Sequence, residues 1–172
     1  TGRVVKNERG KIMDRQSDML FFEVFDGLEN LPTDISDIFQ KVFVERIVAS
    51  RSKAMLKIYI KSYHLISRKQ IKKMEYQLHK QLFNFLSVDI YEHYHLSAQY
   101  TPEKLIEIYK DSLLEELKLK SILKYNILKH SKIDYKDNTF CFNVEDNYLY
   151  KSVCEDFSNY LTNVFKNKFN YD

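Results

Sequence analysis

The chain has 172 residues, of which 44% are hydrophobic and 30% charged, and its formal net charge at pH 7 is +3. This composition is typical of a soluble globular protein with one large or two small domains, and no apolar run approaches the roughly 18 residues that cross a membrane. All three glycines lie at or before Gly27, which excludes P-loops, dinucleotide-binding turns and nucleophile elbows from the rest of the chain, because each needs glycine in its backbone.

Charge is unevenly distributed along the chain. Residues 17–40 carry six acidic side chains and no Lys or Arg, whereas residues 41–84 carry eleven Lys and Arg against two acidic residues. Tyrosines are interleaved with these cations, a mixture suited to phosphate contacts and base stacking. The candidate contacts to nucleic acid or to a partner are Lys53, Lys57, Tyr59, Lys61, Arg68, Lys69, Lys72 and Lys73. The alternative interpretation is a solvated face balanced by the acidic segment.

The N-terminal segment lacks the apolar centre of a signal peptide, so we expect a cytoplasmic protein. We expect residues 1–31 to form a variable, partly disordered leader. A short helix is predicted to follow in TDISDIFQ, with Thr33 as its N-cap.

Residues 32–96 are predicted to form a first α+β domain that contains a hairpin. The stretch KVFVERIVAS alternates as a strand, with Val42, Val44 and Val48 expected on one face. After a polar break, MLKIYIKS alternates apolar residues with Lys and Tyr, which predicts a second strand antiparallel to the first. One face of this hairpin is therefore expected to be apolar and the other basic.

A helix and a third strand complete the predicted first domain. Ser67 is a plausible N-cap for a helix that continues to about Phe83, because apolar residues recur there at three- and four-residue steps. Alternation then resumes over residues 86–93 and predicts a strand.

Residues 97–172 are predicted to form a second α+β domain, because the period changes after residue 96. Thr101 as N-cap and Pro102 at the first helical position begin a helix, and a second helix follows it. The stretch KIDYKDNTFCFNV is expected to form a hairpin, and a long helix ends the chain. Because a lone hairpin is less self-sufficient than a three-stranded sheet, we expect that a closing strand has been lost from this domain.

Few residues favour catalysis or metal binding. Cys141 and Cys154 are too few for a disulfide framework or a zinc site and are expected to be reduced thiols. His93 and His95 would point to the same side of a strand, as a metal pair does, but a third ligand is not evident, and surface histidines are favoured. We therefore predict no catalytic residue, no cofactor and no bound metal.

Three runs of sequence carry a resemblance to a known family: FFEVFDGLENL, then FQKVFVERIVASRSKAMLKIYIKSYHLISRKQIKKMEYQLHKQLF, then YHLSAQYTPEKLIEIYKDSLLEELKLKSILKYNIL. They resemble the N-terminal region of PolC, the Gram-positive-type DNA polymerase III α subunit, and look most like its clostridial members. The block HLSAQYTPEKL is the most specific part of the resemblance. Residues 1–19 fall outside it and are expected to be a variable leader or a segment foreign to the natural protein.

The resemblance implies a non-catalytic region of a DNA-directed DNA polymerase with 3′-5′ exonuclease activity, which docks replisome proteins such as the clamp-loader τ subunit. It implies that the first domain is a KH-like helix-hairpin-helix-strand unit, although the Gly-x-x-Gly loop of KH domains is absent from it. The second domain would be a helix-helix-hairpin-helix unit similar to the small domain of DnaA and of clamp-loader τ. The alternative function is a nucleic-acid-binding module that holds single-stranded or primed DNA on the basic face of residues 41–84. No contact with a membrane is expected.

Overall fold

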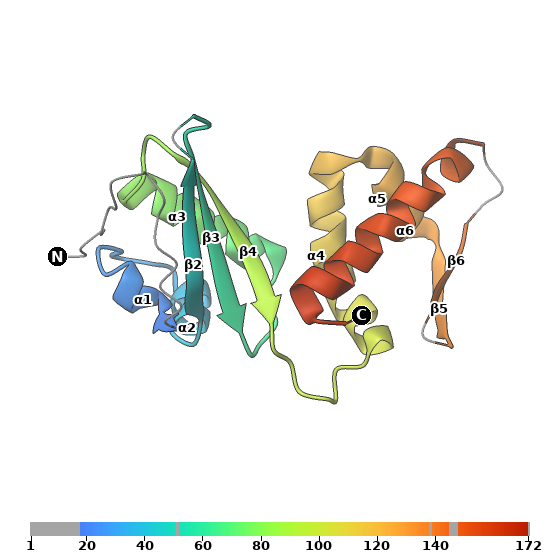
Figure 1. The fold of residues 1–172 in the computed structure, drawn as a ribbon, viewed down its shortest axis with the longest axis horizontal. Coiled ribbons are helices and arrows are strands. Elements are labelled where there is room, and N and C mark those ends of the chain that lie inside the picture. Colours follow the sequence, from blue (N-terminus) through green and yellow to red (C-terminus); the bar gives the residue numbers. More distant parts are fainter. Residues whose placement is uncertain (1–17, 51, 138, 145–147, 172) are drawn as a thin grey trace, which may run out of the picture. The chain divides into compact units, whose positions relative to one another are not determined.

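A computed structural model describes residues 18–50, 52–137, 139–144 and 148–171, and it divides the chain into two compact units (Figure 1). The first unit contains residues up to Ile66 together with Gln70–His95, and the second contains Ser67–Lys69 and the residues from Leu96 onward. Both units combine helices with a small sheet, so the α+β class predicted from the sequence is confirmed. That each unit folds independently stays a prediction. Among the described helices, none is both long and apolar enough to span a bilayer.

The first unit is built on a four-stranded sheet in the order β1-β2-β3-β4. Its strands are β1 (Met19–Leu20), β2 (Phe43–Ser50), β3 (Met55–Ser62) and β4 (Ser87–Tyr94), and its helices are α1 (Phe21–Val24), α2 (Thr33–Phe39) and α3 (Arg68–Gln81). Strands β2 and β3 form the predicted antiparallel hairpin, and β4 pairs parallel to β3. A parallel connection needs a crossover, which α3 provides by passing across one side of the sheet (Figure 1).

The core of the first unit lies between α3 and one face of the sheet. Every second residue of β3, beginning with Leu56, is buried, and so are the residues of α3 that recur at three- and four-residue steps. This core set consists of Leu56, Ile58, Ile60, Ile71, Met74 and Leu78. The predicted periods of strand and helix are therefore confirmed, because each places its apolar residues on the side that packs.

The predicted face assignment along β2 is wrong at its second half. Val44 is buried as expected, but Val48 is 42% exposed. The cause is a β-bulge between Val44 and Arg46, where Glu45 is the extra residue: Val44 lies opposite Ile60 and Arg46 lies opposite Tyr59. One extra residue reverses the alternation, so Arg46 and Val48 point to the side of the sheet away from α3.

The structure extends the first unit toward the N-terminus, into residues that the sequence assigned to a leader. Residues 1–17 lie outside the described part, but Phe21 is fully buried, and its ring centroid lies 4.8 Å from Phe25 and 4.7 Å from Phe39. The amide of Phe21 also donates to Val42 O at 2.8 Å, and β1 pairs with β2. Apolar side chains from residue 21 onward therefore complete this core, whereas the sequence placed the start of the first domain at residue 32.

Two predicted helix caps have different outcomes. Thr33 is the first residue of α2 and Pro32 holds the N-cap position, so the predicted cap is wrong by one residue. Thr101 is the N-cap of α4 (Pro102–Lys120) with Pro102 at the first helical position, as expected. No side-chain hydrogen bond caps that helix, so the fixed φ of Pro102 is the main local signal for its start.

The second unit consists of α4, α5 (Ile122–His130), β5 (Lys132–Lys136), β6 (Thr139–Asn143) and α6 (Tyr148–Phe169). Strands β5 and β6 form the predicted hairpin, with Ile133 opposite Phe142. Aromatic rings join this hairpin to α6: Phe140 lies 4.8 Å from Phe165, and Phe142 lies 5.2 Å from Phe157, between centroids. The small hairpin is thus stabilised by helix packing rather than by a third described strand.

Glu116 links two helices of the second unit. Its carboxylate is 2.7 Å from Lys120 Nζ on the same helix and 3.4 Å from Lys168 Nζ on α6, and its side chain is mostly buried. Burial raises the pKa of this carboxyl, but the two lysines outweigh that effect and leave the pKa below its ordinary value of 4.5. The folded state therefore favours the ionised form of Glu116, and the carboxylate in turn stabilises the folded state.

We expect Phe21→Ala to lower the free energy of unfolding by about 3–5 kcal/mol, because it removes a fully buried aromatic ring from the core. Denaturant unfolding followed by far-ultraviolet circular dichroism measures this change. Phe85→Ala is the matched control, since Phe85 is 87% exposed and its loss should cost less than about 0.5 kcal/mol. If the two substitutions had equal effects, residues 18–31 would not be part of the stabilising core and would be assigned to the leader.

We expect Glu116→Gln to lower the free energy of unfolding by about 1–3 kcal/mol at pH 7. Because the folded-state pKa of Glu116 is lowered, its contribution is present above pH 4.5 and is lost as the pH falls through the folded-state pKa. The difference between wild type and variant should therefore shrink in acid. Glu155→Gln, at an exposed position of α6, is the control. A difference that stays constant from neutral pH to pH 3 would contradict the role of the carboxylate charge.

Candidate nucleic-acid and partner-binding surfaces

The structure does not bring the eight predicted contact residues together. Lys57, Tyr59 and Lys61 occupy the side of β3 that faces away from α3, since the residues between them are buried. Lys53 lies in the turn between β2 and β3. Arg68, Lys69, Lys72 and Lys73 are on α3, which covers the opposite side of the sheet (Figure 1). The basic block of the sequence is therefore divided between two sides of the fold.

Two of the helical cations have acidic partners within the first unit. Lys72 Nζ lies 2.7 Å from the carboxylate of Glu75, which also accepts a hydrogen bond of 2.9 Å from Ile90 N on β4. Lys73 Nζ lies 2.6 Å from Asp34 Oδ2 at the start of α2. Lys73 thus links α3 to α2, whereas the pair of Lys72 and Glu75 lies within α3, and the sequence pattern reveals neither partner.

The side of the sheet away from α3 is here called the open sheet face. It presents Arg46 and Val48 from β2, Lys57, Tyr59 and Lys61 from β3, and Asp89, Tyr91 and His93 from β4. No described helix of the first unit covers this face, because the buried residues of α1, α2 and α3 belong to the core on the other side.

Three side chains form a row across the open sheet face. The Arg46 guanidinium lies 3.9 Å from the ring centroid of Tyr59, and the ring of Tyr59 stacks on Tyr91 at 5.1 Å with an interplanar angle of 18°. Lys57 Nζ lies 5.5 Å from the centroid of Tyr91. Arg46, Tyr59 and Tyr91 are directly opposite one another on adjacent strands, so the pairing register builds the row.

Carboxylates also reach the open sheet face. Asp18 Oδ2 accepts a hydrogen bond of 2.8 Å from Lys61 Nζ, which raises the pKa of the Lys61 ammonium group. Glu45, at the bulge, lies 2.6 Å from His93 Nδ1. Asp89 lies opposite Lys57 in the strand register. The face therefore has cations and anions in similar number, with aromatic rings between them.

The histidines and cysteines that the sequence singled out have simple surroundings. His93 is bound to Glu45, and the ring of His95 lies 6.0 Å from that of Tyr63. Cys141 and Cys154 are free thiols. Within the described ranges, no three His, Cys, Asp or Glu side chains are grouped so as to hold a metal ion.

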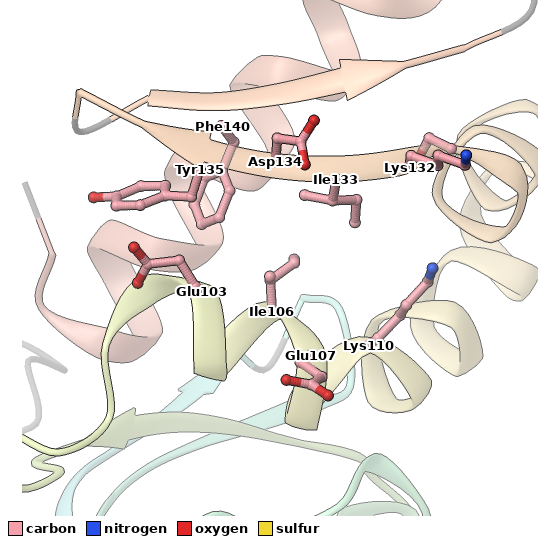
Figure 2. Close-up of a pocket in the computed structure, with 10 residues that line it drawn as sticks. Glu103, Ile106, Glu107, Lys110, Lys132, Ile133, Asp134, Tyr135 and Phe140 are labelled. Carbon is pink, nitrogen blue, oxygen red and sulfur yellow. The ribbon is translucent and has the colours of Figure 1, made fainter.

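A groove of about 540 Å³ lies within the second unit, between α4 and β5 (Figure 2). Ile106 and Ile133 point toward one another across it, and Tyr135 and Phe140 extend its apolar wall. Its charged lining residues are Glu103, Glu107, Lys110, Lys132 and Asp134. The sequence did not predict this groove, because it depends on how the hairpin packs beside residues of α4 that lie more than 20 positions earlier in the chain.

The fold defines a two-unit α+β protein with an aromatic and charged sheet face on one unit and a groove on the other. Residues 20–91 match the family described as DNA polymerase III polC-type N-terminus I. This segment therefore belongs to the N-terminal region of PolC-type DNA polymerase III, which confirms the family that the sequence suggested. No curated protein and no solved structure matches the chain.

The family match falls on the elements of the first unit. The match begins at Leu20, which is in β1, and ends at Tyr91, in β4. It thus includes α1 and its buried Phe21, which the sequence left outside the first domain. Family membership rests on this unit, and the likeness to clostridial members stays a prediction.

Proposed function

We propose that the chain is a non-catalytic N-terminal region of a replicative DNA polymerase, which docks replisome proteins and so positions the polymerase. The match of residues 20–91 to the polC-type N-terminus carries this proposal. On this reading the polymerase and 3′-5′ exonuclease activities belong to other parts of the parent protein, and this region contributes no catalytic residue or cofactor. Its location would be the cytoplasm, where a bacterial chromosome is copied.

The order of elements supports the proposed likenesses of the two units. In the first, α2, the β2-β3 hairpin, α3 and β4 follow one another as in a KH-like arrangement, with β3 central and β4 parallel to it. Its missing Gly-x-x-Gly loop argues against the KH mode of gripping nucleotides. In the second, the order helix, helix, hairpin, helix supports a likeness to the small protein-binding domain of DnaA and clamp-loader τ.

Exposed apolar side chains support docking through the second unit. Leu119, near the end of α4, is 82% exposed, and Ile122, at the start of α5, is 60% exposed. The two side chains are only three residues apart in the chain, and exposed apolar groups that form one patch are typical of a surface that a partner covers. The partner proposed is a replisome protein, with the clamp-loader τ subunit as the first to test.

We expect the double substitution Leu119→Asp and Ile122→Asp to weaken binding of purified clamp-loader τ by about tenfold or more, because it places charges where apolar contact is proposed. Biolayer interferometry with immobilised chain measures the dissociation constant. Phe85→Asp, at an exposed position of the first unit, is the control and should leave binding unchanged. Equal affinity of wild type and double variant would remove this surface from the proposal.

A second candidate function is nucleic-acid binding, and the row of Arg46, Tyr59 and Tyr91 favours it. Cations beside an exposed ring, here that of Tyr91, suit phosphate contact together with base stacking. Only part of the predicted basic block contributes, since Lys72 and Lys73 already have acidic partners on the other side of the sheet. Lys53 and Lys57, on the hairpin, have no such ion pair among the described residues.

We therefore expect reversal of the hairpin cations to matter more than reversal of the helical ones. Lys53→Glu with Lys57→Glu should weaken binding of single-stranded or primed DNA about tenfold at low salt and flatten the dependence of affinity on salt. Lys72→Glu with Lys73→Glu is the comparison and should have a smaller effect. Fluorescence anisotropy across a salt series measures both. If single-stranded and primed DNA both fail to bind the wild-type chain at low salt, this second candidate is rejected.

A further inference from the structure

The row across the open sheet face ends at Tyr91, whose ring is partly exposed to solvent. Tyr91 is on β4, the last strand of the sheet, and its side chain is 38% exposed although Tyr59 stacks against it. Val48 and Arg46 are also exposed on the same face. Cross-strand aromatic pairs stabilise sheets in many proteins, but that role alone does not require an exposed terminal ring with a guanidinium and an ammonium group beside the pair.

The nearly balanced charges of the open sheet face favour single-stranded over double-stranded nucleic acid. Arg46, Lys57 and Lys61 are the cations, and Glu45, Asp89 and Asp18 are as many anions, two of which already bind His93 and Lys61. A duplex offers a protein mainly its phosphates, so a nearly balanced face would hold it weakly. Unpaired bases also offer their ring faces, and stacking on tyrosine does not depend on net charge. The face therefore suits a single strand.

We propose that the open sheet face binds single-stranded nucleic acid, with an unpaired base stacked on the exposed part of Tyr91 and phosphates held by Arg46 and Lys57. This inference rests on the second proposed function and narrows it to one ligand class and one face. The α3 lysines of the sequence-predicted patch have no part in it. The stacked Arg46-Tyr59-Tyr91 row keeps the terminal ring in place before the ligand arrives, so little order is lost on binding.

The test compares three labelled ligands on the full chain at low salt by fluorescence anisotropy: oligothymidylate, an abasic oligomer of equal length, and a duplex. We expect oligothymidylate to bind more tightly than either of the others. Tyr91→Ala should weaken oligothymidylate binding about 5- to 150-fold, the range of a lost base stack, and should leave the abasic oligomer nearly unaffected. Tyr91→Phe keeps the ring and should retain the affinity. Tyr76→Ala, an exposed tyrosine on α3, is the matched control.

The possible results separate this inference from the function on which it rests. If no oligomer binds the wild-type chain, the nucleic-acid function and the inference fail together. If oligothymidylate and the abasic oligomer bind wild type equally, or if the duplex binds as tightly as the single strand, the inference alone is overturned. The wild-type comparison does not depend on any substitution, so it decides the matter even where Tyr91→Ala disturbs the sheet. Equal losses with Tyr76→Ala and Tyr91→Ala would also overturn it.

Discussion

The parallel pairing of β3 with β4 determines the form of the first unit. Two parallel strands in one sheet must be joined by a crossover, and here α3 makes that crossover and buries its apolar side against the sheet. One face of the sheet is thereby committed to the core. Whatever polar and aromatic residues alternate with the core residues of β3 and β4 must lie on the other face, as Tyr59 and Tyr91 do.

The regular parts of this arrangement could be predicted from the sequence because each residue's environment follows from its neighbours along the chain. Leu56, Ile58 and Ile60 alternate without interruption, so the strand and its apolar face were evident. The helix α3 has a clear period of three and four residues and was predicted for the same reason. The direction of β4 could not be assigned, since alternation is the same in parallel and antiparallel strands.

The bulge at Glu45 shows where local pattern fails. Val44 and Val48 are four apart and would share a face in a regular strand, but the extra residue separates them. The amino-acid types around Glu45 do not indicate a bulge. The bulge nevertheless places Arg46 on the open sheet face and allows Glu45 to contact His93. The burial of Phe21 was likewise hidden, because its partners Phe39 and Val42 lie about 20 residues away and its own helix has four residues.

The candidate site also illustrates that the charge of a segment is not the charge of a surface. Residues 41–84 are strongly basic, but folding sends their cations to two sides of a sheet and brings acidic residues from outside the segment to several of them. Asp34 and Asp18, from the acidic stretch, neutralise Lys73 and Lys61. The ion pairs of Lys72 and Lys73 favour the solvated-face interpretation for α3, which stays a prediction, whereas on the open sheet face the aromatic rings are the chemically distinctive groups. Any ligand of that face must gain affinity from ring contact as well as from charge, because each phosphate that approaches a lysine there also approaches a carboxylate.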